Sequence, residues 1–381
     1  MSVEIRRHKP GRDVRDFVRA GEELFRNDPA WVAPLRFEIG QRLHPKHNPF
    51  FDHADVALFT AWRDGRVVGR CSASIDREHL RVWKDDTGFF GFFDTIDDVD
   101  VARALLEEAE RFCAARGMKR MLGPMSLYAN EEIGLLVEGF EHPPVMMMGH
   151  SLPHQHRLAE ACGYDKELDL YCWRYDKRLP MPERTLRAWE TVRALPEVTL
   201  RSLDKCNMRR ELEAIIDIYN DAWGDKWGFV PATPAEADKM VKELSMILDP
   251  DIAFMAEVHG KPAGMCIMVP NLNEAIADMH GRMSPVALAK LLWRLKVKHP
   301  KSTRLIMLGI KKEIRANVKR YGGLSAAMYV ECCKRGVAKG YEWAELSWTR
   351  ENDAPINVGI RALGARRYKT YRVFKKTLTA P

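Results

Sequence analysis

Two stretches of this 381-residue chain, DVALFTAWRDGRVVG (residues 55–69) and DIAFMAEVHGKPAG (residues 251–264), follow the same pattern. Each reads as an alternating apolar run, a G-[RK]-x-x-G turn that begins at Gly65 or Gly260, and a second run. This arrangement predicts two antiparallel strands joined by a tight turn. The two turn glycines lie 195 residues apart, which indicates an internal repeat.

The parallel extends through the rest of both halves. VEIRR from Val3 and VTLRS from Val198 predict strands at the same spacing of 195 residues, and an amphipathic helical pattern follows each. RALLEEAERFCAARG and SAAMYVECCKRGVAKG predict helices that end at Gly117 and Gly340. HRLAEACGYDKELDLYCW and NVGIRALGARRYKTYRVF each predict a short helix, a glycine and a strand. We therefore expect two copies of one α+β unit.

The boundary between the two copies is expected near residue 178, so that residues 1–178 form one domain and residues 179–381 form the other. RLPMPER (residues 178–184) is the expected linker. The first copy carries an extra segment, from about Glu131 to His154, that has no counterpart in the second copy.

Composition restricts the class of protein. Hydrophobic residues make up 46% of the chain and charged residues 30%, which is typical of a soluble globular protein. The net charge of +7 favours an anionic partner but does not choose among a nucleotide, a nucleic acid and an acidic membrane surface. The eight cysteines contain no CxxC pair, as expected for reduced thiols. No apolar run approaches the ~18 residues that cross a bilayer, so a cytoplasmic protein is expected.

A glycine-containing segment, RYGGLS (residues 320–325), stands between a buried-looking strand, RLIMLGI (residues 304–310), and the second-copy helix. Glycines let a diphosphate approach backbone N–H groups, and a helix N-terminus adds partial positive charge. Lysines and arginines at positions 311, 312, 315, 319 and 320 add mobile positive charge. The first copy instead has aspartates at positions 94, 97, 98 and 100, which would repel a polyanion. An ordinary glycine turn with solvated lysines is the open alternative.

The order strand, helix, hairpin, strand, helix, strand, short helix, strand resembles the GCN5-related N-acetyltransferase (GNAT) fold. RYGGLS matches the GNAT signature [QR]-x-x-G-x-[GA] except at Ser325. The resemblance implies two tandem α+β domains (α/β sandwiches), each with a mixed, mostly antiparallel central sheet flanked by helices. It also implies that the second copy binds acyl-CoA as co-substrate. The aspartates of the first copy indicate that this copy is degenerate for coenzyme A binding and shapes the acceptor or acyl site. The implied contacts are Leu308, Gly309, Ile310, Arg315, Lys319, Arg320, Gly322, Gly323, Leu324 and Ser325.

Candidate catalytic residues follow the second-copy helix. EWAELSWTREN alternates as a strand, which places Glu345 and Ser347 on one face. Glu345 is a candidate general base, and its alternative is an edge or solvent-facing carboxylate. Asn352 matches the family's asparagine after the fifth strand, with a helix cap as its alternative.

The family's thiolate-protonating tyrosine has no counterpart at the matching position, where this chain has Gly359. Tyr368 or Tyr371 is the candidate replacement, although two tyrosines in a strand are also typical of packing. Glu313 and His280 are further candidates for acid or base catalysis.

By resemblance, the expected reaction moves an acyl group from coenzyme A to a primary amine. The doubled architecture and the size resemble the bacterial ceramide synthases, which implies a long-chain acyl group and a sphingoid base. PVALAKLLWRLKVKHPK (residues 285–301) predicts a basic amphipathic helix suited to an anionic membrane surface, or else a helix packed on the core. The location would then be peripheral at the inner membrane face.

Two other classes stay open. A non-catalytic acyl-CoA sensor or scaffold would explain the missing tyrosine. A nucleic-acid binder is not expected, because aromatic residues are not interleaved with the cations. No metal site is expected, since His150, His154 and His156 have no carboxylate or cysteine at helical spacing.

Overall fold

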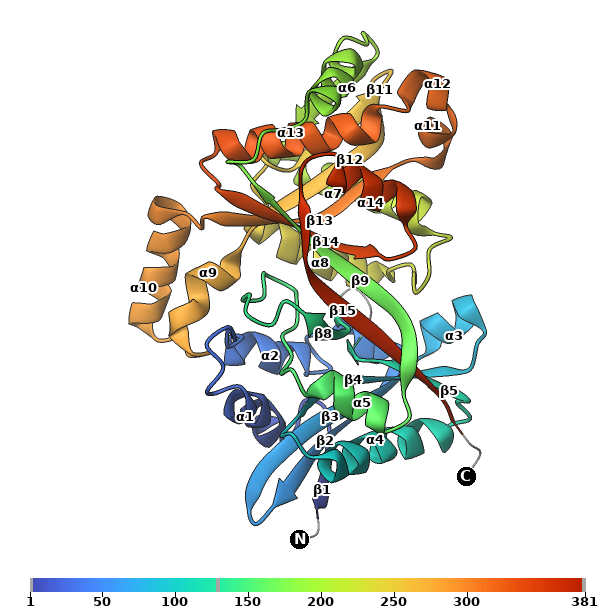
Figure 1. The fold of residues 1–381 in the computed structure, drawn as a ribbon, viewed down its shortest axis with the longest axis vertical. Helices are drawn as coiled ribbons and strands as arrows, with labels where there is room; N and C mark the ends of the chain where they lie inside the picture. Colours follow the sequence, from blue (N-terminus) through green and yellow to red (C-terminus); the bar gives the residue numbers. More distant parts are fainter. Residues whose placement is uncertain (1–2, 128–130, 379–381) are drawn as a thin grey trace. The chain divides into compact units, whose positions relative to one another are not determined.

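The computed structural model describes residues 3–127 and 131–378. These residues form two compact units, which are shown in Figure 1. Unit 1 contains the described residues up to 170 together with 275–293 and 369–378, and unit 2 contains residues 171–274 and 294–368. The boundaries fall inside β9 (Asp165–Asp176) and β15 (Arg366–Thr377), so each of these strands contributes to both units. The division of the sequence at residue 178 stays a prediction about the repeat.

Unit 1 has a sheet in the order β1-β2-β3-β4-β5-β15, and β8 also pairs with β15. Helices α1 and α4 pack on opposite faces of this sheet, because Leu58 joins the apolar cluster of α1 whereas its neighbours Ala57 and Phe59 join that of α4. Besides its parts of β9 and β15, unit 1 contains β1 (Glu4–His8), α1 (Arg15–Leu24), α2 (Arg36–Arg42), β2 (Ala54–Arg63), β3 (Arg66–Asp76), α3 (Arg77–Trp83), β4 (Thr87–Thr95), α4 (Val99–Ala114), β5 (Arg120–Gly123), β6 (Met125–Ser126), β7 (Glu132–Ile133), β8 (Leu135–Glu138), α5 (Gln155–Ala161) and α10 (Pro285–Trp293), with short 3-10 helices at Pro49–Asp52 and Ala277–Met279.

Unit 2 repeats this plan with the order β9-β14-β13-β12-β11-β10. Helices α13 and α6 pack on one face, and α7 and α8 pack on the other. Its elements are α6 (Glu183–Arg193), β10 (Val198–Ser202), α7 (Met208–Trp223), α8 (Pro234–Ile247), β11 (Phe254–Val258), β12 (Lys261–Pro270), α9 (Leu272–Ile276, whose last two residues belong to unit 1), β13 (Ser302–Ile310), α11 (Lys312–Ala316), α12 (Val318–Tyr321), α13 (Leu324–Ala338), β14 (Trp343–Arg350) and α14 (Ala354–Arg361), with a 3-10 helix at Lys205–Asn207 and a π-helix at Arg294–Lys298.

The predicted repeat is confirmed pair by pair in the two hairpins. Gly65 and Gly260 have positive φ angles of 71° and 72°, and the residue before each has a φ of 51°. Positive φ at both central positions is typical of the type I′ turn that joins antiparallel strands. The pairing then skips one residue in each hairpin, between Trp62↔Val67 and Ala61↔Gly69 and between Glu257↔Pro262 and Ala256↔Gly264. These irregularities are also 195 residues apart.

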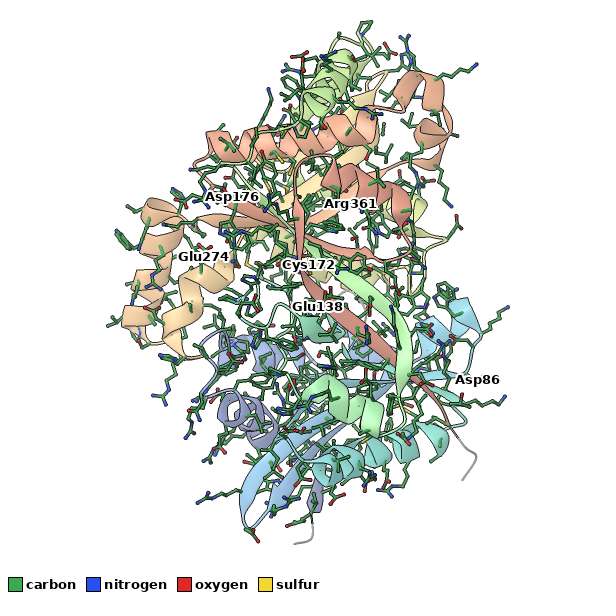
Figure 2. The ribbon with its side chains drawn as sticks, viewed as in Figure 1. Asp86, Glu138, Cys172, Asp176, Glu274 and Arg361 are labelled. Carbon is green, nitrogen blue, oxygen red and sulfur yellow. The ribbon has the colours of Figure 1, made fainter. Side chains whose placement is uncertain are left out.

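The structure adds elements that the sequence patterns did not predict. RLPMPER was interpreted as a linker, but helix α6 begins within it at Glu183 and packs against α13. The segment before α13 contains the short helices α11 and α12, which the sequence patterns did not predict. The extra segment of the first copy supplies β7 and β8, and Thr370 of β15 donates a 2.6 Å hydrogen bond to Glu138, which is labelled in Figure 2.

Helix α4 begins with a side-chain cap. Asp98 Oδ1 accepts hydrogen bonds from the N–H groups of Asp100 (2.9 Å) and Val101 (3.3 Å), while its Oδ2 accepts one from Arg63 (2.7 Å). The bond from Arg63, followed by those from the two N–H groups, holds the pKa of Asp98 below its ordinary value of 3.8. Asp98 therefore stabilises the folded state above pH 3.8, and this stabilisation is lost as the pH falls through the lower pKa of the folded state.

The substitution Asp98→Ala should lower the free energy of unfolding by about 1 to 2 kcal/mol near neutral pH, because α4 loses its cap. Urea unfolding monitored by circular dichroism measures the change. Asp97→Ala is the matched control, since its exposed carboxylate lies 3.6 Å from Arg157, and should change stability by less than about 0.5 kcal/mol. Equal losses in the two variants would contradict the assigned cap.

Candidate active site

The second copy has two parallel strands that pair over only part of their length. β13 and β14 pair from Ser302↔Trp343 to Leu305↔Leu346, after which β13 continues to Ile310 and β14 to Arg350. The pairing of β13 with β12 also skips Ile306, immediately after the last pair with β14. An irregularity of this kind bends a strand, and bulges are frequent next to active sites. In residues 306–310 of β13, the backbone N–H and C=O groups that face β14 are therefore not paired with that strand.

The N–H groups of Leu308 and Ile310 point toward that side. Lys311 donates its N–H to Ala263 on the β12 side (2.9 Å), and successive N–H groups alternate along a strand. Gly309 therefore directs its own N–H toward β12. Close packing explains the glycine at position 309, because a Cβ there would collide with the ring of Trp223 on α7.

Glu345 lies in the middle of β14 and is 0% exposed, so the alternative that it is an edge or solvent-facing carboxylate is wrong. Ser347 Oγ donates a 2.5 Å hydrogen bond to Glu345 Oε1, and the hydroxyl of Tyr368 on β15 donates to Oε2. Hydroxyl donors on both oxygens stabilise a buried carboxylate that would otherwise lose its hydration. The structure thus brings together three of the predicted catalytic residues.

Arg304 was not predicted and belongs to the same cluster. It is buried on β13, directly opposite Glu345 in the parallel register, and its Nε donates to Ser347 Oγ at 3.0 Å. Ser347 therefore accepts from Arg304 and donates to Glu345. A lone arginine at the start of an otherwise apolar strand was the sequence signal, but its partner is visible only from the pairing of the strands.

The two candidate tyrosines have different surroundings. Tyr371 is fully buried in unit 1, where its hydroxyl donates to the carbonyl oxygen of Gly149 at 2.8 Å. Tyr368 joins the Glu345 cluster in unit 2. Glu313 is exposed on α11, and His280 is exposed in unit 1. The catalytic roles of these residues stay predictions.

Asn352 is exposed, and it does not cap the following helix, because Asp353 is the N-cap residue of α14. Asn357, which was not singled out from the sequence, is buried one turn into α14. It accepts a 2.6 Å hydrogen bond from Thr349 and donates a 2.8 Å bond to the carbonyl oxygen of Arg350. Asn357 therefore fixes the end of β14 against α14.

The N-terminus of α13 is open in the described part of the chain. Its N-cap residue is Gly323, and no side chain caps the helix. The N–H groups of residues 323–326 donate no hydrogen bond to any residue that the structure describes. Gly322 needs to be glycine because a Cβ would come within 2.5 Å of the carbonyl oxygen of Val318. Ser325 is exposed, whereas Leu324 is buried in the core. Free N–H groups at the start of a helix are suited to an anion.

Three of the five predicted cations next to this helix are not free. Lys311 pairs with Asp217 (2.7 Å), Lys312 with Asp225, and Arg320 with Glu197 (2.6 Å). The side chains of Arg315 and Lys319 make no ion pair among the residues that the structure describes. The expectation of five mobile cations was therefore wrong, because carboxylates from earlier elements neutralise three of them.

The corresponding place in the first copy is filled by the protein itself. Pairing of β4 with β5 ends at Phe89↔Leu122, and the chain then brings β6 so close that a Cβ on Gly91 would collide with the carbonyl oxygen of Met125. The start of α4 is capped by Asp98. Asp94, Asp97 and Asp100 pair with Arg70 (2.7 Å), Arg157 (3.6 Å) and Arg103 (3.0 Å). Occupied space and a capped helix, rather than repulsion alone, distinguish this copy from the second.

Two of the three clustered histidines, His150 and His154, have separate hydrogen-bond partners. His150 Nε2 bonds to Asp28 (2.9 Å), whereas His154 Nε2 bonds to the carbonyl oxygen of Thr95 (2.7 Å). Burial, the largest effect, lowers the pKa of His150 although Asp28 acts to raise it. Within residues 3–127 and 131–378, no group of three histidine, cysteine, aspartate or glutamate side chains is placed to hold a metal ion.

Nearly the whole chain is similar to known proteins. No protein-family model matches it. It is 39% identical over 370 residues to a protein of Caulobacter vibrioides (strain NA1000 / CB15N) described as bacterial ceramide synthase, with 96% of this chain and 95% of that protein covered. It is 34% identical over 368 residues to Protein YghO of Escherichia coli (strain K12), with 96% and 93% covered.

Solved structures support the fold. A tandem GNAT protein from the clavulanic acid biosynthesis pathway superposes with a TM-score of 0.59 at 12% identity, covering 99% of both chains. A GCN5-related N-acetyltransferase from Sphaerobacter thermophilus gives a TM-score of 0.54 at 13% identity, covering 99% and 96%. The tandem architecture and the sequence identity lead to one assignment. The chain belongs to the family of tandem GNAT-fold N-acyltransferases that includes the bacterial ceramide synthase of Caulobacter vibrioides.

Proposed function

We propose that unit 2 binds an acyl-CoA and transfers its acyl group to the primary amine of a lipidic acceptor. One observation carries the proposal: the open N-terminus of α13 belongs to the same unit as a buried carboxylate with two hydroxyl donors. An open helix start is suited to the diphosphate of coenzyme A, while Glu345 and its donors are suited to proton transfer. Unit 1 lacks the first of these features and is degenerate for coenzyme A.

The donor is held by backbone groups in this proposal. The N–H groups of residues 323–326 bind the diphosphate, assisted by Arg315 and Lys319, which make no ion pair with the residues that the structure describes. The N–H groups of Leu308 and Ile310 bind the pantetheine arm or the thioester oxygen. Gly309 and Leu324 contribute through packing, since one makes room for Trp223 and the other is buried beneath α13.

The residues of the Glu345 cluster move the protons. Glu345 removes a proton from the acceptor ammonium, and the neutral nitrogen attacks the thioester carbonyl carbon. The C–N bond forms and the C–S bond breaks. Glu345 passes the first proton to the departing thiolate through Tyr368, to which it is hydrogen-bonded. The freed carboxylate then takes the second proton from nitrogen and releases it to solvent when the products leave. Arg304 and Ser347 act as positioning residues, because they hold Glu345 in one orientation.

The 39% sequence identity to the bacterial ceramide synthase of Caulobacter vibrioides supports a long-chain acyl donor and a sphingoid base as acceptor. Both substrates carry apolar chains, which brings the enzyme to a membrane surface. No helix among the described residues is long and apolar enough to cross a bilayer. Because the proposed substrates are lipidic, we propose peripheral attachment at the inner membrane face.

The direct test incubates the full chain with mixed acyl-CoA donors and candidate amines, including long-chain amino alcohols. Mass spectrometry of the products should identify an N-acyl amide that depends on one class of donor and one class of amine. Tight binding of acyl-CoA without any amide product would favour the alternative of a non-catalytic sensor or scaffold.

The substitution Ser325→Asp should weaken acyl-CoA binding by at least about tenfold, because a carboxylate beside the helix start repels the diphosphate. It should leave stability unchanged or slightly higher, since an acidic residue in the first turn of a helix is favourable. Isothermal titration calorimetry with coenzyme A measures the affinity. Ser325→Asn is the uncharged control of similar size, and equal affinities for the two variants would contradict the donor site.

Glu345→Gln should lower kcat by about 10² to 10⁴, because general acid–base catalysis contributes about that much, while coenzyme A affinity is retained. Tyr368→Phe should lower kcat in the same assay. Steady-state kinetics of thiol release measures both variants. Glu313→Gln is the control, as Glu313 is exposed on α11, and a loss equal to that of Glu345→Gln would reassign the base.

A further inference from the structure

Helix α10 (Pro285–Trp293), orange in Figure 1, exposes most of its apolar side chains. The exposed fractions are 78% for Val286, 46% for both Leu288 and Leu292, and 52% for Trp293. Met283, before the helix, and Val297, after it, are also exposed. The alternative that the leucines of this helix pack on the core is therefore wrong for two of them.

The orientation of α10 shows that its apolar face points outward. Ala287 and Leu291, four residues apart, are its least exposed positions and mark the side that faces the protein. Leu288, Leu292 and Trp293 are exposed and lie on the rest of the helix surface, away from Ala287 and Leu291. An apolar face that a fold leaves exposed in this way is typical of an interaction surface.

The helix is nevertheless well anchored in unit 1. Ser284 Oγ caps it by accepting a 3.1 Å hydrogen bond from the N–H of Ala287, and Lys290 pairs with Asp278 at 2.5 Å. Just before the helix, the carbonyl oxygen of Gly281 accepts a 3.0 Å bond from the N–H of Arg36. The apolar face is thus held in place by polar contacts on the other side of the segment.

Charge indicates what covers this face. Between positions 281 and 301 the chain has six lysines and arginines and no aspartate or glutamate (cations at 282, 290, 294, 296, 298 and 301). Glu274, which precedes the segment and is labelled in Figure 2, already accepts hydrogen bonds from the N–H of Lys301 (2.7 Å) and from Ser302. Lys298 and Arg282 are exposed. The partner therefore has to combine an apolar interior with negative charge at its surface.

We propose that α10 and the basic segment after it, up to residue 301, dock the protein on an anionic lipid membrane. Leu288, Leu292 and Trp293 enter the boundary between headgroups and acyl chains, where tryptophan is favoured, and the exposed cations Arg282 and Lys298 attract the lipid phosphates. The attraction to anionic headgroups falls with added salt. This inference rests on the surface of α10 and does not depend on the proposed reaction.

The test is flotation of the full chain with vesicles of phosphatidylcholine, with or without phosphatidylglycerol. We expect binding to the vesicles that contain phosphatidylglycerol, weakened by added NaCl, and little binding to phosphatidylcholine alone. Leu292→Asp should lower the vesicle-bound fraction by at least about tenfold, because it places a carboxylate in the apolar face. Val337→Asp is the matched control, since Val337 is 45% exposed on α13, and it should bind as the wild type does.

Equal losses in the two variants, or no flotation of the wild type, would overturn the proposal. Sedimentation velocity tests a second copy of the chain as the partner: a wild-type dimer that Leu292→Asp converts to monomer would also overturn it. Thiol release from a short-chain acyl-CoA with a soluble amine, measured without vesicles, should be the same for Leu292→Asp and wild type. Flotation without amide formation from any tested acyl-CoA and amine, long-chain amino alcohols included, would contradict the proposed function and leave membrane docking intact.

Discussion

The first N–H groups of a helix have no carbonyl partners within the helix, and the two copies of this fold satisfy them in different ways. In unit 1, Asp98 caps α4, and Arg63 holds the carboxylate in place. In unit 2, Gly323 stands at the start of α13, and no side chain caps it. An open helix start of this kind favours an anionic ligand by roughly 0.3 to 1 kcal/mol from the dipole alone, before direct N–H bonds are counted. One copy is therefore complete without a ligand, whereas the other is prepared for one.

Glu345 imposes a second constraint, because a carboxylate cannot be buried without donors. Its donors come from β14 and β15, and Arg304 on β13 supports one of them. The pairing of β13 and β14 ends one residue after Arg304 and Glu345, so the buried cluster adjoins the backbone that the sheet leaves unused. The separation of β13 from β14 thus positions both the proposed base, Glu345, and the backbone N–H groups proposed to bind acyl-CoA.

Much of the fold could be predicted from the sequence, because the repeat of 195 residues is preserved down to single strand pairs. Helix α6 could not, since its proline-rich start is typical of a linker and its partner is α13; Trp189 donates a 2.9 Å hydrogen bond to Glu331. Glu345 and Ser347 could be placed on one face by strand alternation. Arg304 and the carboxylates that neutralise Lys311, Lys312 and Arg320 could not, because those contacts join elements far apart in the chain. The local patterns predicted elements and faces, but not their long-range partners.

Hydrogen–deuterium exchange with and without coenzyme A tests the asymmetry between the two copies most directly. The account predicts slower exchange on binding in peptides that cover Gly322 to Ala326 and Leu308 to Ile310, with no change at residues 98–101. Protection at the start of α4, or binding of coenzyme A with no protection at the start of α13, would contradict it.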